Sequence, residues 1–521
     1  AGGPEDSGLA AGGGQQNGKM LNGISDSMSK VGSAVGSIGK GIGQAIGGVF
    51  AGIMQGIADG IAAIGSAKTL KGIAAVGLLA GVLYGFGQAL DSFSQLDWDT
   101  INSGLLTIGL VVAAAAVALI ATSMPASQAA KQLEIFTWWA SGGEAAGLKG
   151  MTDIFTKENP GVPFVNASVA GAAGVNAKGV LVSRMAAGDP PDTFQAHAGQ
   201  ELSSYVKAGN LEDLTFLYKQ EGWDKVFPAG LIKQLTVKGK IYSVPVNIHR
   251  ANVLWWNPAA AAKAGITKAP KTMAEFFDGL EKFKKSGIDG IALAGNGDWA
   301  IAHLFDWVLL ASMGPDKYNG LWNGKTPWTG GDVSKAIDNL AKILSYGNSS
   351  KSLDWPDAGK LVTSGKAGFF IMGDWASSQW QSEGLKLGTD YTFAPAPGAT
   401  NVYMWLSDSF TLPKGAKNRD IAINWLKVCG SKAGQDSFNP KKGSIAVRTD
   451  SDPSLYDNYL QSAMKDWKKD ILVGSTVHGV NYNNAGMAAY DSAVGKFYNG
   501  NAKDKKGLVK GLVAAYKASK A

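Results

Sequence analysis

The chain of 521 residues is poor in several residue types that whole protein classes require. It has a single cysteine, Cys429, so no disulfide can form within the chain, and we interpret the thiol as a small buried side chain. Four scattered histidines and one cysteine show no spacing that would hold a metal ion. No phosphate-binding loop of the GxxxxGKS or GxxxxGKT type is present. The sequence therefore predicts neither a metal ion nor a cofactor.

The basic charge lacks the clusters that nucleic-acid-binding proteins carry. The formal net charge is +7, but the lysines and arginines are dispersed and form no long block, so no nucleic-acid partner is predicted. The first 130 residues contain five lysines, no arginine and seven acidic residues, and only one of the 16 tryptophans. We therefore expect two different parts that meet near residue 130, and two to four domains in total.

Residues 1–130 form a Gly/Ala-rich hydrophobic segment that we expect to be helical. Glycines recur there at a spacing of four, which allows close helix contact in membranes. The stretches 72–90 and 103–122 carry no charge, and each is long enough to cross a hydrocarbon core of about 30 Å. The second stretch can also be read as a signal-peptide core, with Ser127 and Ala129 before the cleavage site, although no basic region precedes it.

Residues 20–122 also resemble the hydrophobic part of phage tail tape-measure proteins. The Gly-rich helix and GLLAGVLYGFGQALDSFSQLDW carry this likeness, which implies a membrane-active or tail-packing segment. The segment could thus be membrane-spanning, tape-measure-like, a cleaved leader, or part of a composite with an unrelated protein. By the positive-inside rule Lys68 and Lys71 face the cytoplasm, so the number of spans decides on which side the remaining chain lies.

From Leu133 onward, strand and helix patterns alternate along the chain. Short apolar runs indicate buried strands, and apolar residues at helical spacing indicate the helices between them. The expected strands are 133–139, 162–169 and 192–197, and the expected helices are 144–158 and 176–187. Such alternation predicts an α/β fold with a parallel sheet.

The stretch LEIFTWWASGGE is the most informative in the chain. Ligands of open α/β sheets sit beyond the carboxyl ends of the strands, which is where Trp138 and Trp139 fall. Flat aromatic rings cover the C–H face of a pyranose, and a carboxylate such as Glu144 accepts hydrogen bonds from its hydroxyls. A parallel sheet would bring Gln195 and His197 to the same edge. The alternative is a core tryptophan pair beside a solvated glutamate.

Seven motifs follow one another from about residue 133 to the C-terminal end: WW-x-SGGE, GDPPDTFQAH, YSVPVNIHRANVLWWNP, IMGDW, LSDSFTLPKGAKN, FNPKKGS and VGSTVHG. Together they resemble the glucose/mannose-type binding proteins of ABC sugar importers. The resemblance implies a two-lobed periplasmic-binding-protein fold, in which hinge strands at about 247–252 and 404–409 let the lobes close on a monosaccharide. One lobe would comprise 131–246 plus about 410–450, and the other about 253–403 plus 451–521.

The resemblance also implies a set of ligand contacts, carried over position by position. Trp138 and Trp139 match an aromatic wall, and Glu144 matches a hydroxyl acceptor. An aromatic from the opposite lobe and six polar contacts complete the set: Trp299, Gln195, His197, Asp374, Asp408, Lys442 and His478. Two of these have local alternatives, because Asp374 could cap a helix and Lys442 could be a solvated charge.

All four histidines fall inside or beside these motifs, a placement that favours functional roles. We expect His197 and His478 to contact the ligand, and we expect His249 and His303 at a hinge or behind the contact residues. Trp255, in the VLWWNP motif, is expected with its neighbour Trp256 in the lobe core.

The leading hypothesis is a non-catalytic extracytoplasmic receptor that captures glucose, or else mannose or galactose, and delivers it to ABC permease subunits. We expect a monomer in the periplasm or at the extracellular face, anchored through residues 72–122 if that segment is retained. A separate subunit would supply the ATPase. One alternative is a glycoside hydrolase, with its carboxylate pair drawn from Glu144, Asp374 and Asp408. The other is a membrane or phage-tail structural protein that acts through residues 1–130.

Overall fold

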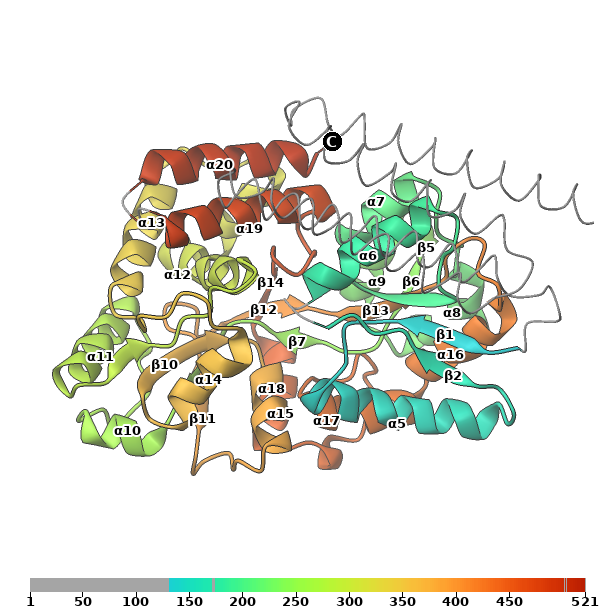
Figure 1. Cartoon of the computed structure of the whole chain (residues 1–521), viewed down its shortest axis with the longest axis horizontal. Coiled ribbons are helices and arrows are strands. Elements are labelled where there is room, and N and C mark those ends of the chain that lie inside the picture. Colours follow the sequence, from blue (N-terminus) through green and yellow to red (C-terminus); the bar gives the residue numbers. More distant parts are fainter. Residues whose placement is uncertain (1–130, 171–173, 501, 503, 521) are drawn as a thin grey trace, which may run out of the picture. The chain divides into compact units, whose positions relative to one another are not determined.

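The computed structural model of the chain describes residues 131–170, 174–500, 502 and 504–520 (Figure 1). All of them belong to one compact unit of the chain. The predictions for residues 1–130, including both candidate membrane spans, the leader and the tape-measure likeness, lie outside the described residues.

The first sheet has five strands in the order β2-β1-β3-β13-β6. Its parallel part consists of β1 (Leu133–Phe136), β2 (Phe164–Asn166) and β3 (Thr193–His197), as the βαβ pattern predicts. The later strand β13 (Asp408–Thr411) inserts antiparallel between β3 and β6 (Ser243–Pro245). The register pairs Asp408 with His197 and Phe410 with Gln195, so residues more than 200 positions apart meet in the interior of the sheet.

Seven α-helices, one 3-10 helix and a short hairpin accompany this sheet. They are α5 (Gly142–Glu158), α6 (Val175–Ala186), α7 (Glu201–Lys207), α8 (Thr215–Glu221), η3 (Trp223–Lys225), α9 (Ala229–Leu235), β4 (Thr236–Val237), β5 (Lys240–Ile241), α16 (Arg419–Gly430) and α17 (Lys432–Lys442). Helix α5 buries Leu148, Met151 and Phe155 at helical spacing. Helix α5 packs closely on α17, and the lack of a side chain at Gly150 allows this approach. A Cβ atom there would lie 2.8 Å from the carbonyl oxygen of Ser437.

The second sheet has four strands in the order β11-β8-β10-β9. Its strands are β8 (Val253–Trp256), β9 (Asp289–Ile291), β10 (Ala367–Met372) and β11 (Thr392–Pro395). The helices that follow these strands in the chain are α10 (Pro258–Lys263), α11 (Met273–Lys285), α12 (Trp299–Asn323), α13 (Gly331–Leu344), α14 (Trp355–Thr363) and α15 (Trp375–Ser382). Gly314, with φ +77°, and Pro315 interrupt α12. Trp255 lies fully buried in this core, as expected, whereas its neighbour Trp256 is only half-buried against it.

A third sheet of three strands, in the order β14-β12-β7, lies where the chain passes between the two larger sheets. It consists of β7 (His249–Arg250), β12 (Val402–Leu406) and β14 (Ile471–Gly474). Strand β12 runs on through Ser407 into β13 of the first sheet. Strand β7 lies within the expected hinge range 247–252, and the end of β12 with Ser407 falls in the range 404–409, whereas β14 matches no expected hinge. The lobe boundaries and the hinge motion remain predictions.

The C-terminal elements complete the described region. They are η4 (Pro453–Leu455), α18 (Asn458–Lys469), α19 (Asn484–Asn499) and α20 (Lys505–Ala518). Helix α19 packs against both α20 and α12 (Figure 1). In the part of the chain that the structure describes, no helix combines the length and the apolar character needed to span a membrane.

Candidate functional site

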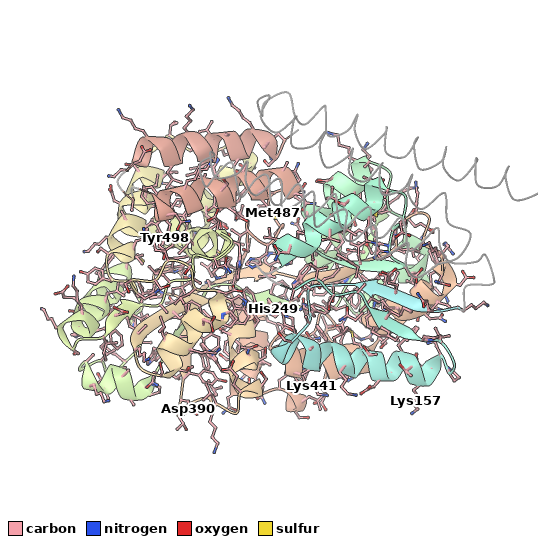
Figure 2. All side chains as sticks on the ribbon, viewed as in Figure 1. Lys157, His249, Asp390, Lys441, Met487 and Tyr498 are labelled. Carbon is pink, nitrogen blue, oxygen red and sulfur yellow. The ribbon has the colours of Figure 1, made fainter. Side chains whose placement is uncertain are left out.

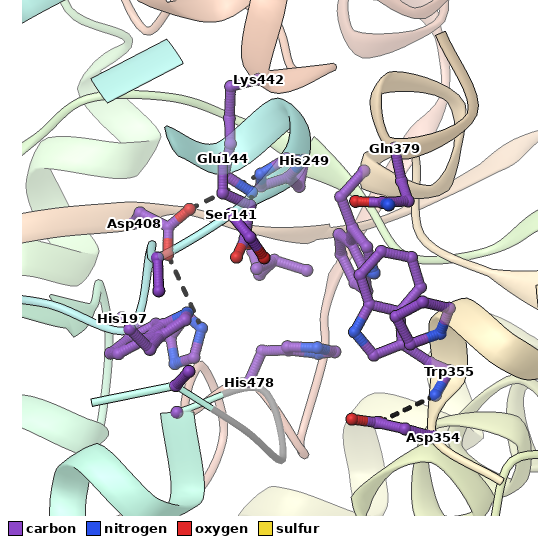
Figure 3. A pocket seen from close by; sticks show the side chains of 17 residues that line it. Ser141, Glu144, His197, His249, Asp354, Trp355, Gln379, Asp408, Lys442 and His478 are labelled. Atoms are coloured by element: carbon purple, nitrogen blue, oxygen red, sulfur yellow. Dashed lines mark hydrogen bonds and ion pairs between the residues drawn. The ribbon is translucent and has the colours of Figure 1, made fainter. Parts of the chain in front are cut away.

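A cavity of about 380 Å³ lies between residues in or beside strands of the first and third sheets and residues at the starts of α14 and α15 (Figure 3). Its walls combine three indoles, three imidazoles and four charged side chains with Gln379 and small or apolar neighbours. The lining residues are Trp138, Ala140, Ser141, Glu144, Ala170, Gly174, His197, His249, Asp354, Trp355, Pro356, Trp375, Gln379, Leu406, Asp408, Lys442 and His478. Six of the ten predicted contact residues are among them: Trp138, Glu144, His197, Asp408, Lys442 and His478.

The paired tryptophans that follow β1 point to different surroundings. Trp138 lines the cavity, and its indole contacts Gly174, where a Cβ atom would come within 2.7 Å of the ring. Trp139 is fully buried, packs against Phe410 and Phe438, and is not among the lining residues. Adjacent residues of an extended chain point to opposite sides, so only one indole of such a pair faces the cavity.

Gln195 lies behind the cavity wall and connects two residues of that wall. Its Oε1 accepts a hydrogen bond from the Trp138 backbone N–H at 3.3 Å, and its Nε2 donates to Asp408 Oδ1 at 2.9 Å. The side chain is buried and is not among the residues that line the cavity. Gln195 therefore holds Trp138 and Asp408 in place.

Asp408, the first residue of β13, is the buried carboxylate of the site. Besides the bond from Gln195, it accepts one from Asn247 Nδ2 at 2.8 Å. His249 Nε2 lies 3.5 Å from one carboxylate oxygen, and His197 Nε2 lies 3.8 Å from the other. Burial alone would raise the pKa of Asp408, but His249, Lys442 and His197 together hold it well below its ordinary range. The group is an anion that offers acceptors to a ligand.

His197 connects this carboxylate to a second acid. Its Nδ1 lies 2.8 Å from Glu201 Oε2, and Lys178 Nζ donates to the same oxygen at 2.9 Å. Burial favours the neutral acid, yet Lys178 and His197 outweigh it and lower the pKa of Glu201 to about 2. His197 is thereby held between two carboxylates at the end of β3.

His249 lines the cavity, although the sequence pointed to a hinge or supporting role for it. In Figure 2 His249 lies near the middle of the part of the chain that the structure describes, and Lys157 and Asp390 lie at the edges of that part. Its Nδ1 contacts the carboxylate of Asp374. Burial disfavours the charged ring, but Asp374 prevails and the pKa of His249 is raised.

Asp374 itself is fully buried and does not line the cavity. Its Oδ2 accepts the backbone N–H of Arg250 at 2.8 Å, and its Oδ1 contacts His249. It occupies the N-cap position of α15, as the helix-cap alternative has it, but its side chain makes no cap hydrogen bond there. The structure places this carboxylate behind His249, which is the group that faces the cavity.

Lys442 and Glu144 form an ion pair on the cavity wall. Lys442 Nζ donates to Glu144 Oε1 at 3.1 Å, which joins the end of α17 to the start of α5. The lysine side chain is only 3% exposed, so the alternative of a solvated charge is wrong. Its ammonium also lies 5.7 Å from the ring centre of Trp139.

His478 reaches into the cavity from the loop after β14 (Figure 3). Its Nδ1 lies 2.8 Å from Ser475 Oγ, whereas its buried Nε2 has no hydrogen-bond partner among the described residues. His303 and Trp299 pack against this ring, and both are buried behind the cavity surface rather than in its lining. Burial lowers the pKa of His303 to about 4.

Sequence reasoning missed the opposite side of the cavity. Trp355 and Trp375 begin α14 and α15, and Gln379 lies one turn into α15. Trp375 packs edge-on against His249 at 5.3 Å and against His478 at 5.2 Å between ring centres. The IMGDW motif already contained Trp375, and Asp354 followed by Trp355-Pro356 is a helix-start signal. Neither pattern reveals which side chains reach a cavity.

The arrangement suits binding better than hydrolysis. A glycosidase needs one carboxyl group that is protonated near neutral pH, and the pKa of Asp408 is shifted in the opposite direction. Glu144 is paired with Lys442, and Asp374 lies outside the cavity lining. Within the described ranges, no group of three or more His, Cys, Asp or Glu side chains is placed to hold a metal ion.

Comparisons with known proteins agree with this geometry. Residues 132–436 match the family model described as bacterial extracellular solute-binding protein. A probable sugar-binding periplasmic protein of Rhizobium meliloti is 36% identical over 417 residues, which cover 78% of this chain and 98% of the relative. An uncharacterized ABC transporter extracellular-binding protein of Pyrococcus horikoshii is 34% identical over 363 residues, which cover 69% of this chain and 82% of the relative. The fold matches that of a chitin oligosaccharide binding protein with a TM-score of 0.66 at 21% identity, covering 75% of this chain and 99% of that one.

Proposed function

This chain belongs to the bacterial extracellular solute-binding proteins, and we propose that its solute is a monosaccharide held in the cavity beside Trp138. Members of this family are receptors, so the chain is a binding protein and not an enzyme. The single observation that carries the proposal is a cavity with indoles on two sides and ionised or hydrogen-bonding groups between them.

The chemistry of the lining supports a sugar. A pyranose has apolar C–H faces and a rim of hydroxyls, and Trp138 on one side with Trp355 and Trp375 on the other can cover those faces. Carboxylates accept hydrogen bonds from hydroxyls, and a buried ammonium donates to them. Asp408 and Lys442 supply these two complementary charges.

The size of the cavity supports a small sugar. Ligand pockets in proteins typically enclose about 300–1,000 Å³, and a volume of about 380 Å³ lies near the lower end of that range. A single pyranose fits within such a volume, whereas a trisaccharide would have to extend beyond it. Glucose is the first candidate, followed by mannose and galactose, because the seven sequence motifs resemble the glucose/mannose-type receptors.

In the mechanism we propose, two lobes close on the sugar. One lobe comprises 131–246 plus about 410–450, and the other about 253–403 plus 451–521, with hinges at about 247–252 and 404–409. The three-stranded sheet formed by β7, β12 and β14 supports this division, because it occupies the connections between the two larger sheets. Closure would bring Trp355 and Trp375 toward Trp138 and exclude water from the charged groups.

The closed receptor would deliver its sugar to ABC permease subunits outside the cytoplasm. The relatives named as ABC transporter extracellular-binding protein and probable sugar-binding periplasmic protein support this place of action. The direct contacts we propose are Trp138, Glu144, His197, His249, Asp408, Lys442 and His478, with Trp355 and Trp375 opposite. Gln195, Asp374, Trp299, His303 and Trp139 support these groups from behind.

Isothermal titration calorimetry of the full chain tests the proposal. We expect glucose, mannose or galactose to bind with a stoichiometry of one and to quench tryptophan fluorescence, and maltotriose to bind far more weakly. A Trp138→Ala variant should lose most of the heat signal, and the exposed Lys441→Met variant should retain it. Absence of binding by every monosaccharide, or equally tight binding of maltotriose, would contradict the proposal.

A further inference from the structure

Asp306 is a fully buried carboxylate on α12 that does not line the cavity, yet it organises a loop that does. Its Oδ2 accepts the backbone N–H groups of Thr476 at 2.7 Å and Val477 at 3.3 Å. The hydroxyl of Ser475 donates to the same oxygen at 3.2 Å, and Tyr490 Oη donates to Oδ1 at 3.1 Å. Burial raises the pKa of Asp306 to about 7, against the opposing effect of these hydrogen bonds. Three of the four donors converge on Oδ2, so a proton bound by the carboxyl group would lie on Oδ1, and Oδ2 accepts in either state.

The direction of the hydrogen bond between Ser475 and His478 follows from these contacts of Asp306. A serine hydroxyl has one proton to donate, and Ser475 directs it to Asp306 Oδ2, an oxygen that already receives two backbone N–H groups. Ser475 Oγ can therefore only accept from His478 Nδ1, which lies 2.8 Å away. The imidazole proton is then on Nδ1, and Nε2 carries a free lone pair.

That lone pair is buried and has no hydrogen-bond partner among the described residues. His478 is 4% exposed, lines the cavity, and points into it (Figure 3). Burial, reinforced by the neighbouring His303 and His197, lowers the pKa of His478 well below its ordinary value, so the ring stays neutral. A buried acceptor without a partner carries a free-energy cost that a bound donor would remove.

We propose that Asp306 is a positioning residue that acts through Ser475 to hold His478 with its proton on Nδ1, so that Nε2 accepts a hydrogen bond from one ligand hydroxyl. The identity of that ligand as a sugar rests on the proposed function, whereas the proton position does not. This chain of hydrogen bonds from Asp306 through Ser475 to His478 requires the ligand to present a hydrogen-bond donor to Nε2. A fluorine at that carbon has no proton to donate to Nε2, so a sugar with this substitution would be rejected.

The proton position can be measured by ¹⁵N NMR of the full chain labelled at histidine. We expect His478 to show a protonated Nδ1 and an unprotonated Nε2 in the absence of sugar. In Ser475→Ala the carboxylate keeps both backbone N–H bonds, so the loop should stay in place while the Nδ1 proton loses its acceptor. We expect this variant to show a mixture of the two neutral forms.

Sugar titrations of the native chain and of the Ser475 and Asp306 variants measure the effect on ligand affinity. We expect Ser475→Ala to weaken glucose binding about three- to tenfold, the order of one hydrogen bond. Among monofluorinated glucoses, one should bind the native protein far more weakly than glucose, and that discrimination should shrink in Ser475→Ala. In Asp306→Asn the amide oxygen should take the place of Oδ2, where it still accepts from Ser475 and from both backbone N–H groups, so the imidazole proton should stay on Nδ1.

Tyr490→Phe is the matched control because it removes only the bond to Asp306 Oδ1. It should lower thermal stability without moving the His478 proton or changing the fluoro-sugar pattern. A native His478 protonated on Nε2, or a Ser475→Ala variant with unchanged proton position and affinity, would overturn the inference. If the proton is on Nδ1 but no sugar binds, the proposed function fails while the positioning role of Asp306 stands.

Discussion

His249 Nε2 lies 3.5 Å from Asp408 Oδ2, and Nδ1 of the same ring contacts the carboxylate of Asp374. One imidazole thus lies between two buried carboxylates, and it connects strand β7 of the central sheet with β13 of the first sheet. Asp374 raises the pKa of His249, with a smaller contribution from Asp408, and His249 in turn helps to lower the pKa of Asp408. The site is therefore charged before any ligand arrives, so its acceptors and donors do not need to be created by binding.

The two adjacent tryptophans should respond oppositely to truncation. Trp138→Ala should weaken sugar binding by about 2 kcal/mol or more, roughly 30-fold, because it removes an aromatic surface of the cavity. Trp139→Ala should instead lower the free energy of unfolding by about 3–5 kcal/mol, because the indole is fully buried against Phe410 and Phe438. Calorimetric titration and urea unfolding measure the two effects. Equal losses of affinity with unchanged stability in both variants would contradict this division.

Lys442 should matter for binding, whereas its neighbour Lys441 should not. Lys442→Met removes a buried donor and leaves Glu144 without its ion pair, so we expect a tenfold or larger loss of sugar affinity. Glu144→Gln combined with Lys442→Met should cost less than the two single changes added together, because both remove the same ion pair. The exposed Lys441→Met variant is the control. A large fall in melting temperature with unchanged affinity would point to a purely structural lysine.

Asp408→Asn tests the electrostatic coupling at the centre of the site. The amide keeps the shape but removes the negative charge beside His249, so the pKa of His249 should fall. NMR titration of the His249 ring follows that pKa directly, and sugar affinity should fall in parallel because an acceptor becomes partly a donor. An unchanged His249 pKa would show that Asp374 alone holds the charge.

The buried His303 predicts a specific dependence of stability on pH. Its pKa is lowered from about 6.5 in the unfolded chain to about 4 in the folded protein, so folding favours the neutral ring. This contribution is complete above pH 6.5 and is lost as the pH falls toward 4, by roughly 3 kcal/mol at most. Urea unfolding of native protein and His303→Gln at several pH values isolates it. The native protein should lose stability relative to the variant over this range, and parallel curves would refute the assignment.

Local patterns were sufficient to predict the first part of the fold. Strand β1, helix α5 and strand β3 each follow from apolar spacing, and Asn159-Pro160-Gly161 and Asp189-Pro190-Pro191 mark the breaks between them. The insertion of β13 between β3 and β6 was not predictable in the same way. It depends on pairing between residues more than 200 positions apart, which no local pattern records.

The site shows the same limit at the level of single residues. A tryptophan pair at a strand end indicates that one indole faces outward, but the sequence does not say whether it is Trp138 or Trp139. Asp374 and His249 belong to separate motifs, and only the folded chain shows that the histidine faces the cavity while the carboxylate lies behind it. Trp355 reaches the cavity from a helix start that no sugar-binding pattern marked.

A crystal structure of the full chain with bound glucose tests the central claim most directly. We predict the pyranose ring against the Trp138 indole, with ring carbons within about 4–4.5 Å of it and with hydroxyls bonded to Asp408, Lys442 and His478. A sugar bound outside this cavity, or bound within it without contact to Trp138, would contradict the account.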